Sequence, residues 1–209
     1  MRSRKLGTPL TIALACLLAG SALAVNPLFD LTLEWRPTNK VSKKDKVDLA
    51  GLAGIAIKVQ PLVDRRHVPN PQRIGENREN EKKGEVLEVL TKDDVAAFCT
   101  TNFAATLKHL GLPVNATGAT VTISGELTSF FVTEKDGYTG DVSLSLKVTN
   151  ARGEVLWSGV AKGAAKHGGR SYNASNYFET LSNSLQEAVL GLVKDRGFLD
   201  ALAGKPTVK

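Results

Sequence analysis

Three consecutive segments in the middle of the chain alternate between apolar and polar side chains, and nothing else in the sequence limits the fold as strongly. These segments are residues 119–132, 138–149 and 154–164. Alternation with a period of two is typical of a strand that buries one face. The turn-forming residues 135–137 and 150–153, each ending in glycine, separate the segments. We therefore predict three antiparallel strands joined by two hairpins.

The alternation also predicts which face of this sheet meets the core. The apolar positions of the first two strands are Val121, Ile123, Leu127, Phe131, Val142, Leu144, Leu146 and Val148. The intervening positions are polar, namely Thr120, Thr122, Ser124, Glu126, Ser143, Ser145 and Lys147. An antiparallel sheet commonly packs one face and leaves the other to water or to a partner. We expect the polar face to be such a surface.

Two further strands are predicted nearer the amino terminus. Residues 28–36 alternate with a period of two, and residues 53–60 are largely apolar and end at Pro61. Residues 37–50 are rich in lysine and indicate an exposed loop. Residues 61–90 are polar and charged, so we expect a long loop, which in a compact domain is either functional or disordered.

Two helices complete the pattern. Thr91 and Asp94 have the spacing of a capping box, and apolar residues follow at helical spacing until Gly111. A second helix is expected to begin near Asn176 and to end at Gly197. The order β-β-α-β-β-β-α predicts an α+β fold. In it, two helices pack on one face of a mixed, mostly antiparallel sheet.

The amino terminus predicts export from the cytoplasm. A basic start, an apolar run and small residues ending in Ala22-Leu23-Ala24 form the three parts of a secretory signal peptide. The apolar run is shorter than the roughly 20 residues that a membrane span requires. Cleavage is expected between Ala24 and Val25, which leaves a periplasmic or secreted protein. Cys16 is a weaker match to a lipobox, so lipid anchoring, with peripheral membrane association, is the less favoured alternative.

Removing this leader (residues 1–24) leaves one predicted α+β domain, residues 25–203, and a flexible tail, residues 204–209. The leader contains three basic residues and no acid, so the formal net charge falls from +6 to +3. Nucleic-acid-binding domains usually carry a concentrated basic stripe, and we predict no nucleic-acid partner. Cys99 is the one cysteine left, and its place on the apolar side of a predicted helix indicates a buried thiol.

The topology places candidate binding residues at one end of the sheet. A crossover helix joins the strand at 53–60 to the strand at 119–132, so these strands are predicted to be parallel. The loops that follow them then meet at one rim, near the amino ends of both helices. The residues that we expect to bind a partner there are Asp64, Arg65, Arg66, Arg170 and Tyr172. The alternative is an exposed loop end where Asp64 and an arginine form a local ion pair.

No catalytic or metal-binding motif is complete. Gly169-Arg170-Ser171-Tyr172-Asn173 approaches the G-x-S-x-G pattern of hydrolases, but Asn173 replaces the last glycine. A serine hydrolase that uses Ser171 is therefore a remote alternative. The three histidines are scattered and have no partner at metal-ligand spacing. We predict no catalytic residue, no metal and no cofactor.

Several short stretches together resemble a known family. Val59-Gln60-Pro61-Leu62-Val63-Asp64-Arg65-Arg66 leads to Ile74-Gly75. Much later come Gly153-Glu154-Val155-Leu156-Trp157-Ser158-Gly159 and the entry to the last helix, from Tyr172 to Leu185. Over roughly residues 53–195 they resemble the YajG-type lipoproteins of bacterial envelopes. The resemblance implies a periplasmic, non-enzymatic accessory protein. These relatives are typically anchored through a lipobox cysteine, for which this chain offers only Cys16.

These features favour a binding or adaptor module of the cell envelope whose partner is another envelope protein. Either the rim or the polar sheet face would make the contact. The alternative function is a periplasmic carrier of a small anionic ligand, held at the positive amino ends of the two helices.

Overall fold

The structure is a computed structural model that describes residues 28, 30–48, 52, 54–115 and 117–205. The predicted leader, its cleavage site and Cys16 lie outside the described residues. Of the predicted tail, only Gly204 and Lys205 are described. Within the described ranges, no helix is both long enough and apolar enough to span a membrane.

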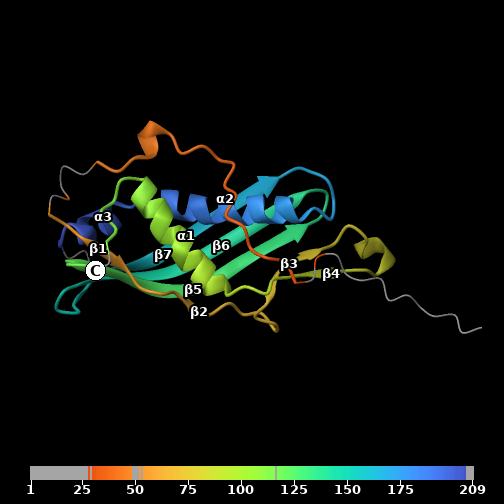
Figure 1. The fold of residues 1–209 in the computed structure, drawn as a ribbon, viewed down its shortest axis with the longest axis horizontal. Coiled ribbons are helices and arrows are strands. Elements are labelled where there is room, and N and C mark those ends of the chain that lie inside the picture. The colour runs from red at the N-terminus through yellow and green to blue at the C-terminus, as the bar shows by residue number, and fades with distance from the viewer. Residues whose placement is uncertain (1–27, 29, 49–51, 53, 116, 206–209) are drawn as a thin grey trace, which may run out of the picture.

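Three long strands form the centre of the sheet, as the alternation predicts. β5 (Val121–Glu134), β6 (Tyr138–Asn150) and β7 (Val155–His167) pair antiparallel in sequence order. Figure 1 shows these strands running side by side beneath the helices. The predicted apolar face of β6 is buried, because Val142, Leu144, Leu146 and Val148 are at most 1% exposed.

A discontinuous row of short strands runs along the other side of β5. β1 (Ile57–Val59), β2 (Val63–Asp64) and β3 (Arg73–Asn77) each pair parallel to β5, and β4 (Leu87–Leu90) pairs antiparallel to β3. The prediction that the strand at 53–60 is parallel to the strand at 119–132 is confirmed by the pairing of β1 with β5. The prediction of a loop throughout residues 61–90 is wrong, because strands of two to five residues are too short to give a periodic signal.

The predicted strand at 28–36 is also wrong. Residues 31–41, here called the strap, run extended across a helix and share only one β-bridge with the sheet, between Leu31 and Thr91. The strap bonds to side chains instead, since Arg36 N donates to Ser182 Oγ at 3.0 Å. An extended segment buries alternate side chains whether or not it joins a sheet, so its period of two was misleading.

Two long helices, α1 (Val95–His109) and α2 (Ala174–Leu192), cover one face of the sheet, as predicted. Asp94 caps α1 by accepting a hydrogen bond from Ala97 N at 2.9 Å. The capping box expected at Thr91 is wrong, because the Thr91 hydroxyl donates to Leu31 O at 2.8 Å and so holds the strap.

The carboxyl-terminal helical region consists of two helices rather than one. α2 begins after its cap Asn173 and ends at Leu192, whereas a separate helix, α3, spans Arg196–Leu202. Asp195 starts α3 by accepting a hydrogen bond from Phe198 N at 3.1 Å. Gly197, expected to end the second helix, lies inside α3. A capping aspartate thus outweighs the low helix propensity of glycine here.

A bulge in β5 changes which phenylalanine enters the core. The register between β5 and β6 shifts between Leu127 and Ser129, which inserts one extra residue. One inserted residue exchanges the two faces of every position that follows. Phe130, 1% exposed, therefore lies in the core, and the expectation that Phe131 would lie there is wrong. Phe131 faces the other side of the sheet, where Arg73 lies 5.5 Å from its ring centroid.

Two glycines on the covered face allow α2 to lie close to the sheet. A Cβ added at Gly163 would lie 2.0 Å from Ser184 O and 2.3 Å from Ala188 N. A Cβ added at Gly140 would lie 2.6 Å from Ser184 Oγ. Glycine in a strand often marks such a close approach of another backbone. These positions therefore set the distance between α2 and the sheet.

The thiol of Cys99 is expected to be unreactive in the folded protein. The residue is fully buried in the core, as its place on the helix predicted, and burial raises the pKa of its thiol far above the usual range. Because the thiolate is the reactive form, a maleimide added to the native mature chain should label less than a few per cent of molecules. Labelling should be complete in denaturant. Rapid labelling without denaturant would contradict this packing.

Candidate functional site

The predicted rim residues do not form one cluster. Asp64 pairs with Leu127 near the middle of β5, whereas Arg170 and Tyr172 lie beyond Glu134, the last residue of β5. Seven residues of strand separate the two places, which is about 23 Å. β1 and β2 end partway along β5, so Asp64 and Arg66 lie well before its carboxyl end. Only the later part of the predicted loop reaches that end, through β3 and through Asn80, whose Nδ2 donates to Tyr172 Oη at 3.1 Å.

Arg66 acts as an internal clamp of the loop that follows β2. Its side chain is only 2% exposed and donates to both carboxylate oxygens of Asp64, to Arg73 O at 2.9 Å and to Pro71 O at 2.7 Å. Burial acts to raise the pKa of the Asp64 carboxyl, but the hydrogen bonds from Arg66 outweigh it and lower the pKa. The contact between Asp64 and Arg66 is the local ion pair that was the predicted alternative to a binding site at the rim. Arg65, in contrast, is exposed and lies 3.8 Å from Glu126.

Arg170 and Tyr172 shape the turn that leads into α2. Arg170 O accepts hydrogen bonds from Tyr138 Oη at 2.7 Å and from Asn176 Nδ2 at 2.9 Å. Tyr172 has a φ of 59°, which is unfavourable for a residue with a side chain, and its N–H donates to Glu134. The predicted anion site at the helix ends stays a prediction. The Asp94 carboxylate already occupies the amino end of α1.

Glu134 is the centre of a buried polar cluster that the sequence analysis missed. Its carboxylate is fully buried and accepts hydrogen bonds from Tyr177 Oη, Asn77 Nδ2 and Tyr172 N. Burial, and then the hydrogen bond to this carboxylate, raise the pKa of the Tyr177 hydroxyl far above its ordinary value. The bulge in β5 brings Glu134 to the core face together with Val132. A strict alternation with a period of two does not predict this change of face.

Alkaline pH should therefore destabilise the fold through Tyr177. An unfolded tyrosine loses its proton near pH 10, whereas folded Tyr177 keeps its proton to much higher pH. Above pH 10 the unfolded state binds fewer protons, so the free energy of unfolding should fall by about 1.4 kcal/mol per pH unit for this group. Burial also raises the pKa of Tyr138, which adds to the loss.

Urea unfolding at a series of pH values from 9 to 11 measures this slope. Tyr177→Phe should flatten it, whatever the variant's stability at neutral pH. An unchanged slope in Tyr177→Phe would contradict the assignment of the alkaline loss to this hydroxyl.

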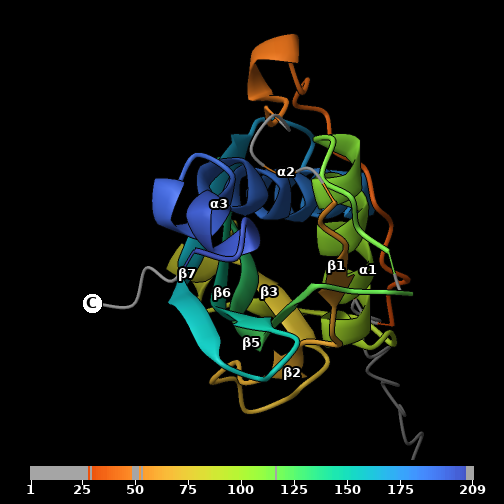
Figure 2. The ribbon, with the colours of Figure 1, turned by 90° about the vertical axis from the view of Figure 1, so that its left-hand side faces the viewer.

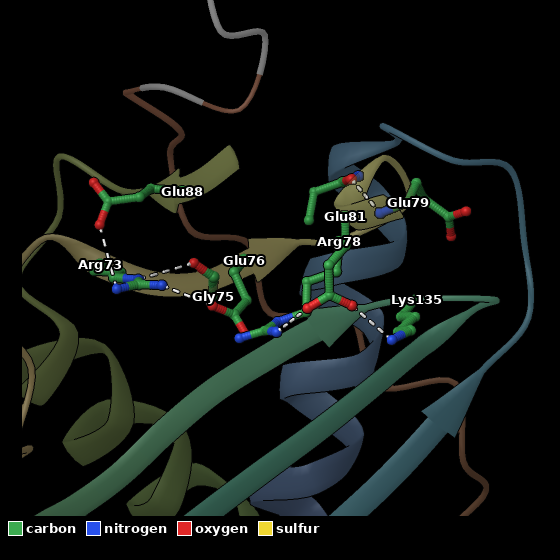
Figure 3. A network of polar contacts seen from close by, with 9 residues as sticks. Arg73, Gly75, Glu76, Arg78, Glu79, Glu81, Glu88 and Lys135 are labelled. Atoms are coloured by element: carbon green, nitrogen blue, oxygen red, sulfur yellow. Dashed lines mark hydrogen bonds and ion pairs between the residues drawn. The ribbon is translucent and has the colours of Figure 1, made fainter. Parts of the chain in front are cut away.

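The opposite side of the same sheet end carries a network of paired charges (Figure 3). Glu76 lies opposite Thr133 in the register of β3 and β5, and Thr133 precedes Glu134 in β5. Because successive side chains of a strand point to opposite faces, Glu76 faces away from the Glu134 cluster. The network joins three basic and three acidic residues, Arg73, Arg78, Lys135, Glu76, Glu81 and Glu88. Arg73 lies 2.8 Å from Glu76, and Lys135 lies 2.6 Å from Glu81. These charges neutralise one another, so this end of the sheet is an unfavourable place for a charged partner.

The rest of this side, here called the open face, is the candidate binding surface. In the described chain, all three α-helices lie on the other side of the sheet (Figure 2). The register aligns Ser143 with Lys162, Ser145 with exposed Val160, and Lys147 with Ser158 across β6 and β7. Four exposed lysines, Lys58, Lys147, Lys162 and Lys166, have no ion-pair partner among the described residues.

Two grooves indent the open face beside β2. One, of about 450 Å³, lies between the clamped loop and the bulge and is lined by Pro69, Phe131 and Asp141, among others. The other, of about 340 Å³, is lined by Val63, Ser145 and Lys147, among others. The open face thus combines a flat, polar, basic area with two depressions that can receive side chains of a partner.

Neither a metal-ligand cluster nor a serine paired with a histidine is assembled among the described residues. The described part of the chain contains no cluster of three or more potential metal-ligating side chains. Ser171 is exposed in the turn before α2, and within the described residues it forms no hydrogen bond with a histidine. The hydroxyl of a nucleophilic serine needs a neighbouring base within hydrogen-bonding reach. The geometry therefore gives no support to the hydrolase alternative.

Comparison with known proteins identifies the fold. No family model matches the chain, and no curated protein matches it. A Xanthomonas campestris protein of family DUF330 has a similar structure, with a TM-score of 0.51 and 11% identity over 72% of this chain and 86% of that one.

Two more distant structures also align. A hypothetical protein from Chlamydia trachomatis gives a TM-score of 0.43 at 9% identity, over 74% of this chain and 99% of that one. A putative lipoprotein from Caulobacter crescentus gives 0.41 at 14% identity, over 53% of this chain and 84% of that one. The likeness to the Xanthomonas protein shows a shared fold.

Proposed function

We propose that this protein is a non-enzymatic accessory protein of the bacterial envelope that binds another envelope protein through the open face of its sheet. The observation that carries the proposal is the open face itself. It is polar, no described α-helix covers it, and three long paired strands hold it rigid. Rigid scaffolds that present prepared surfaces lose little entropy on binding, which favours such surfaces for recognition.

The charges of the open face favour an acidic partner. Its four unpaired lysines and Arg65 outnumber the acids Glu126 and Asp141 on the same side. Complementary charge mainly speeds association and excludes wrong partners. Serine and threonine side chains between the lysines can donate and accept hydrogen bonds without committing to one partner geometry.

The envelope location rests on the sequence. We propose that residues 1–24 direct export and that cleavage leaves Val25 as the mature amino terminus. Lipid anchoring through Cys16 is the alternative. The short stretches around Asp64 and Trp157 support membership of the YajG-type family, whose members are envelope proteins.

Reversing charge on the open face should weaken partner binding. We expect Lys147→Glu combined with Lys162→Glu to reduce the affinity for an acidic partner at least ten-fold, because two attractive contacts become repulsive. The measurement is the yield of partner that co-purifies with the tagged mature chain from envelopes, followed by a binding titration with the purified partner. The matched control, Lys108→Glu on α1 with Lys194→Glu after α2, makes the same charge change on the helical side.

Alanine variants of the rim residues test whether the partner binds at the rim or on the open face. Arg170→Ala and Tyr172→Ala should leave partner binding within two-fold of wild type. Arg66→Ala is unsuitable because it would free the clamped loop. If the rim variants abolish binding and the open-face reversal does not, the partner binds at the rim and the proposal is wrong.

A further inference from the structure

β7 forms one edge of the sheet and is paired on one side only. In the strand order β4-β3-β5-β6-β7 it comes last, and Figure 2 shows it at the margin of the sheet. Along residues 158–166, here called the free edge, the backbone bonds to β6 and to no other described residue. Every second residue of an antiparallel strand turns its N–H and C=O away from its neighbour. The free edge therefore offers unused donors and acceptors over about 30 Å.

The free edge lacks most of the features that prevent another strand from joining a sheet. Natural edge strands are protected by short length, proline, bulges or charged side chains. The free edge contains no proline, and the β7 bulge lies before it, where the register shifts opposite Val148 and Thr149. Most of its residues are small, namely Gly159, Ala161, Gly163, Ala164 and Ala165. Small side chains leave the backbone accessible to another strand.

Two lysines are the one protection of the free edge, and they indicate the chemistry of a strand that could join it. Lys162 and Lys166 are exposed and have no ion-pair partner among the described residues. A second copy paired antiparallel along the whole free edge would place Lys162 opposite the same lysine of the other copy. Like charges directly opposite each other destabilise a sheet, whereas opposite charges stabilise it. The lysines therefore favour an acidic strand over a second copy.

An exposed valine adds an apolar contact beside these charges. Val160 is 56% exposed, more than any other large apolar side chain of the described residues. Because side chains alternate along a strand, Val160, Lys162 and Lys166 all face the same side of the sheet, which is the open face. A strand that joins β7 would cover Val160 with its own apolar side chain.

We propose that an extended acidic segment of the partner adds to β7 as an antiparallel strand. Its acidic side chains lie opposite Lys162 and Lys166, and an apolar side chain lies opposite Val160. In strand addition, main-chain hydrogen bonds supply affinity and alternate side chains supply specificity. This inference rests on the proposed function, because it names the segment of the acidic partner that extends the open face by one strand.

A short synthetic peptide, acetyl-Glu-Thr-Val-Thr-Glu-Thr-Val-Thr-Thr-amide, is the probe. In an antiparallel register its two glutamates lie opposite Lys166 and Lys162, and its second valine lies opposite Val160. We expect saturable binding to the mature chain in an NMR titration. Amide exchange should slow at every second residue of the free edge, because those N–H groups gain acceptors.

Two methylated forms of the peptide test the main-chain bonds. N-methyl groups on alternate amides keep every side chain and remove either the N–H groups that face β7 or those that face away. One form should bind at least about ten-fold more weakly than the unmethylated peptide, and the other should bind within about three-fold of it.

A charge exchange tests the two lysines. Lys162→Glu combined with Lys166→Glu should weaken binding about ten-fold, and a peptide with lysines in place of both glutamates should restore it. The matched control, Lys58→Glu with Arg65→Glu, makes the same charge change on β1 and after β2, which pair with β5 and lie far from β7. It should change the affinity by less than about three-fold.

The proposal is overturned if the peptide does not bind or if its two methylated forms bind equally. It is also overturned if the mature chain alone is a dimer whose free-edge amides already exchange slowly, because a second copy would then occupy the edge. Equal binding of the methylated forms would mean that side chains alone hold the peptide, which leaves the proposed function standing. The proposed function is judged separately, by the partner that co-purifies from envelopes.

Discussion

Replacing Gly163 with alanine is expected to lower the free energy of unfolding by about 3 kcal/mol. The added methyl group would lie 2.0 Å from Ser184 O and 2.3 Å from Ala188 N, and both are backbone atoms that no rotamer change can move. α2 would have to shift away from the sheet, which opens space around Leu181 and Leu185 in the core. Urea unfolding of the mature chain measures the change.

Gly168→Ala is the matched control. A Cβ at Gly168 meets no atom within 4 Å, and its φ lies outside the positive range that disfavours side chains. The same chemical change there should alter stability by less than about 1 kcal/mol, with a stabilising sign, since it restricts the unfolded chain. Equal effects at the two positions would show that α2 does not pack closely on β7.

The second large effect is expected from Glu134→Ala, at about 3–4 kcal/mol. The substitution leaves Tyr177 Oη and Tyr172 N without their acceptor, removes one of the two acceptors of Asn77 Nδ2, and creates a cavity. Tyr172 would also lose the hydrogen bond that accompanies its positive φ, so the turn into α2 should loosen. Thermal and urea unfolding both measure the loss.

Glu126→Ala on the open face is the control for a carboxylate in a strand. Its side chain is half exposed and only loosely paired with Arg65, so its removal should cost less than about 1 kcal/mol. Glu134→Gln should fall between the two, because an amide keeps the shape but loses one acceptor oxygen. If Glu134→Ala were as stable as Glu126→Ala, the buried cluster would not contribute to the fold.

Sequence patterns predicted the fold where elements are long. The alternation of β6 and the helical spacing of α1 and α2 extend over many residues, so local exceptions do not obscure them. β2 and β3 are short, and they form because β5 offers a parallel edge, which is a tertiary effect. The strap shows the opposite error, a strand that was predicted but does not form. Its alternation reflects packing against α2 without strand pairing.

The candidate site was predicted in part. The polar face of β5 and β6 follows directly from alternation, and Ser143, Ser145 and Lys147 lie there as expected. The rim prediction assumed that parallel strands end level with one another, but β2 ends beside Leu127. Where a short strand stops along a long neighbour depends on packing and hydrogen bonding, which periodicity does not encode. The Glu134 cluster was missed because a single inserted residue in β5 changed the face of every later position.

In-cell photocrosslinking tests the central claim, that the open face binds an envelope protein. A photoreactive residue is placed at Ser143 on the open face, at Tyr172 on the rim, and at exposed Thr101 on α1 as the control. We predict one discrete protein adduct from Ser143 and none from Thr101. An adduct from Tyr172 with none from Ser143, or no adduct from any position, would contradict the claim.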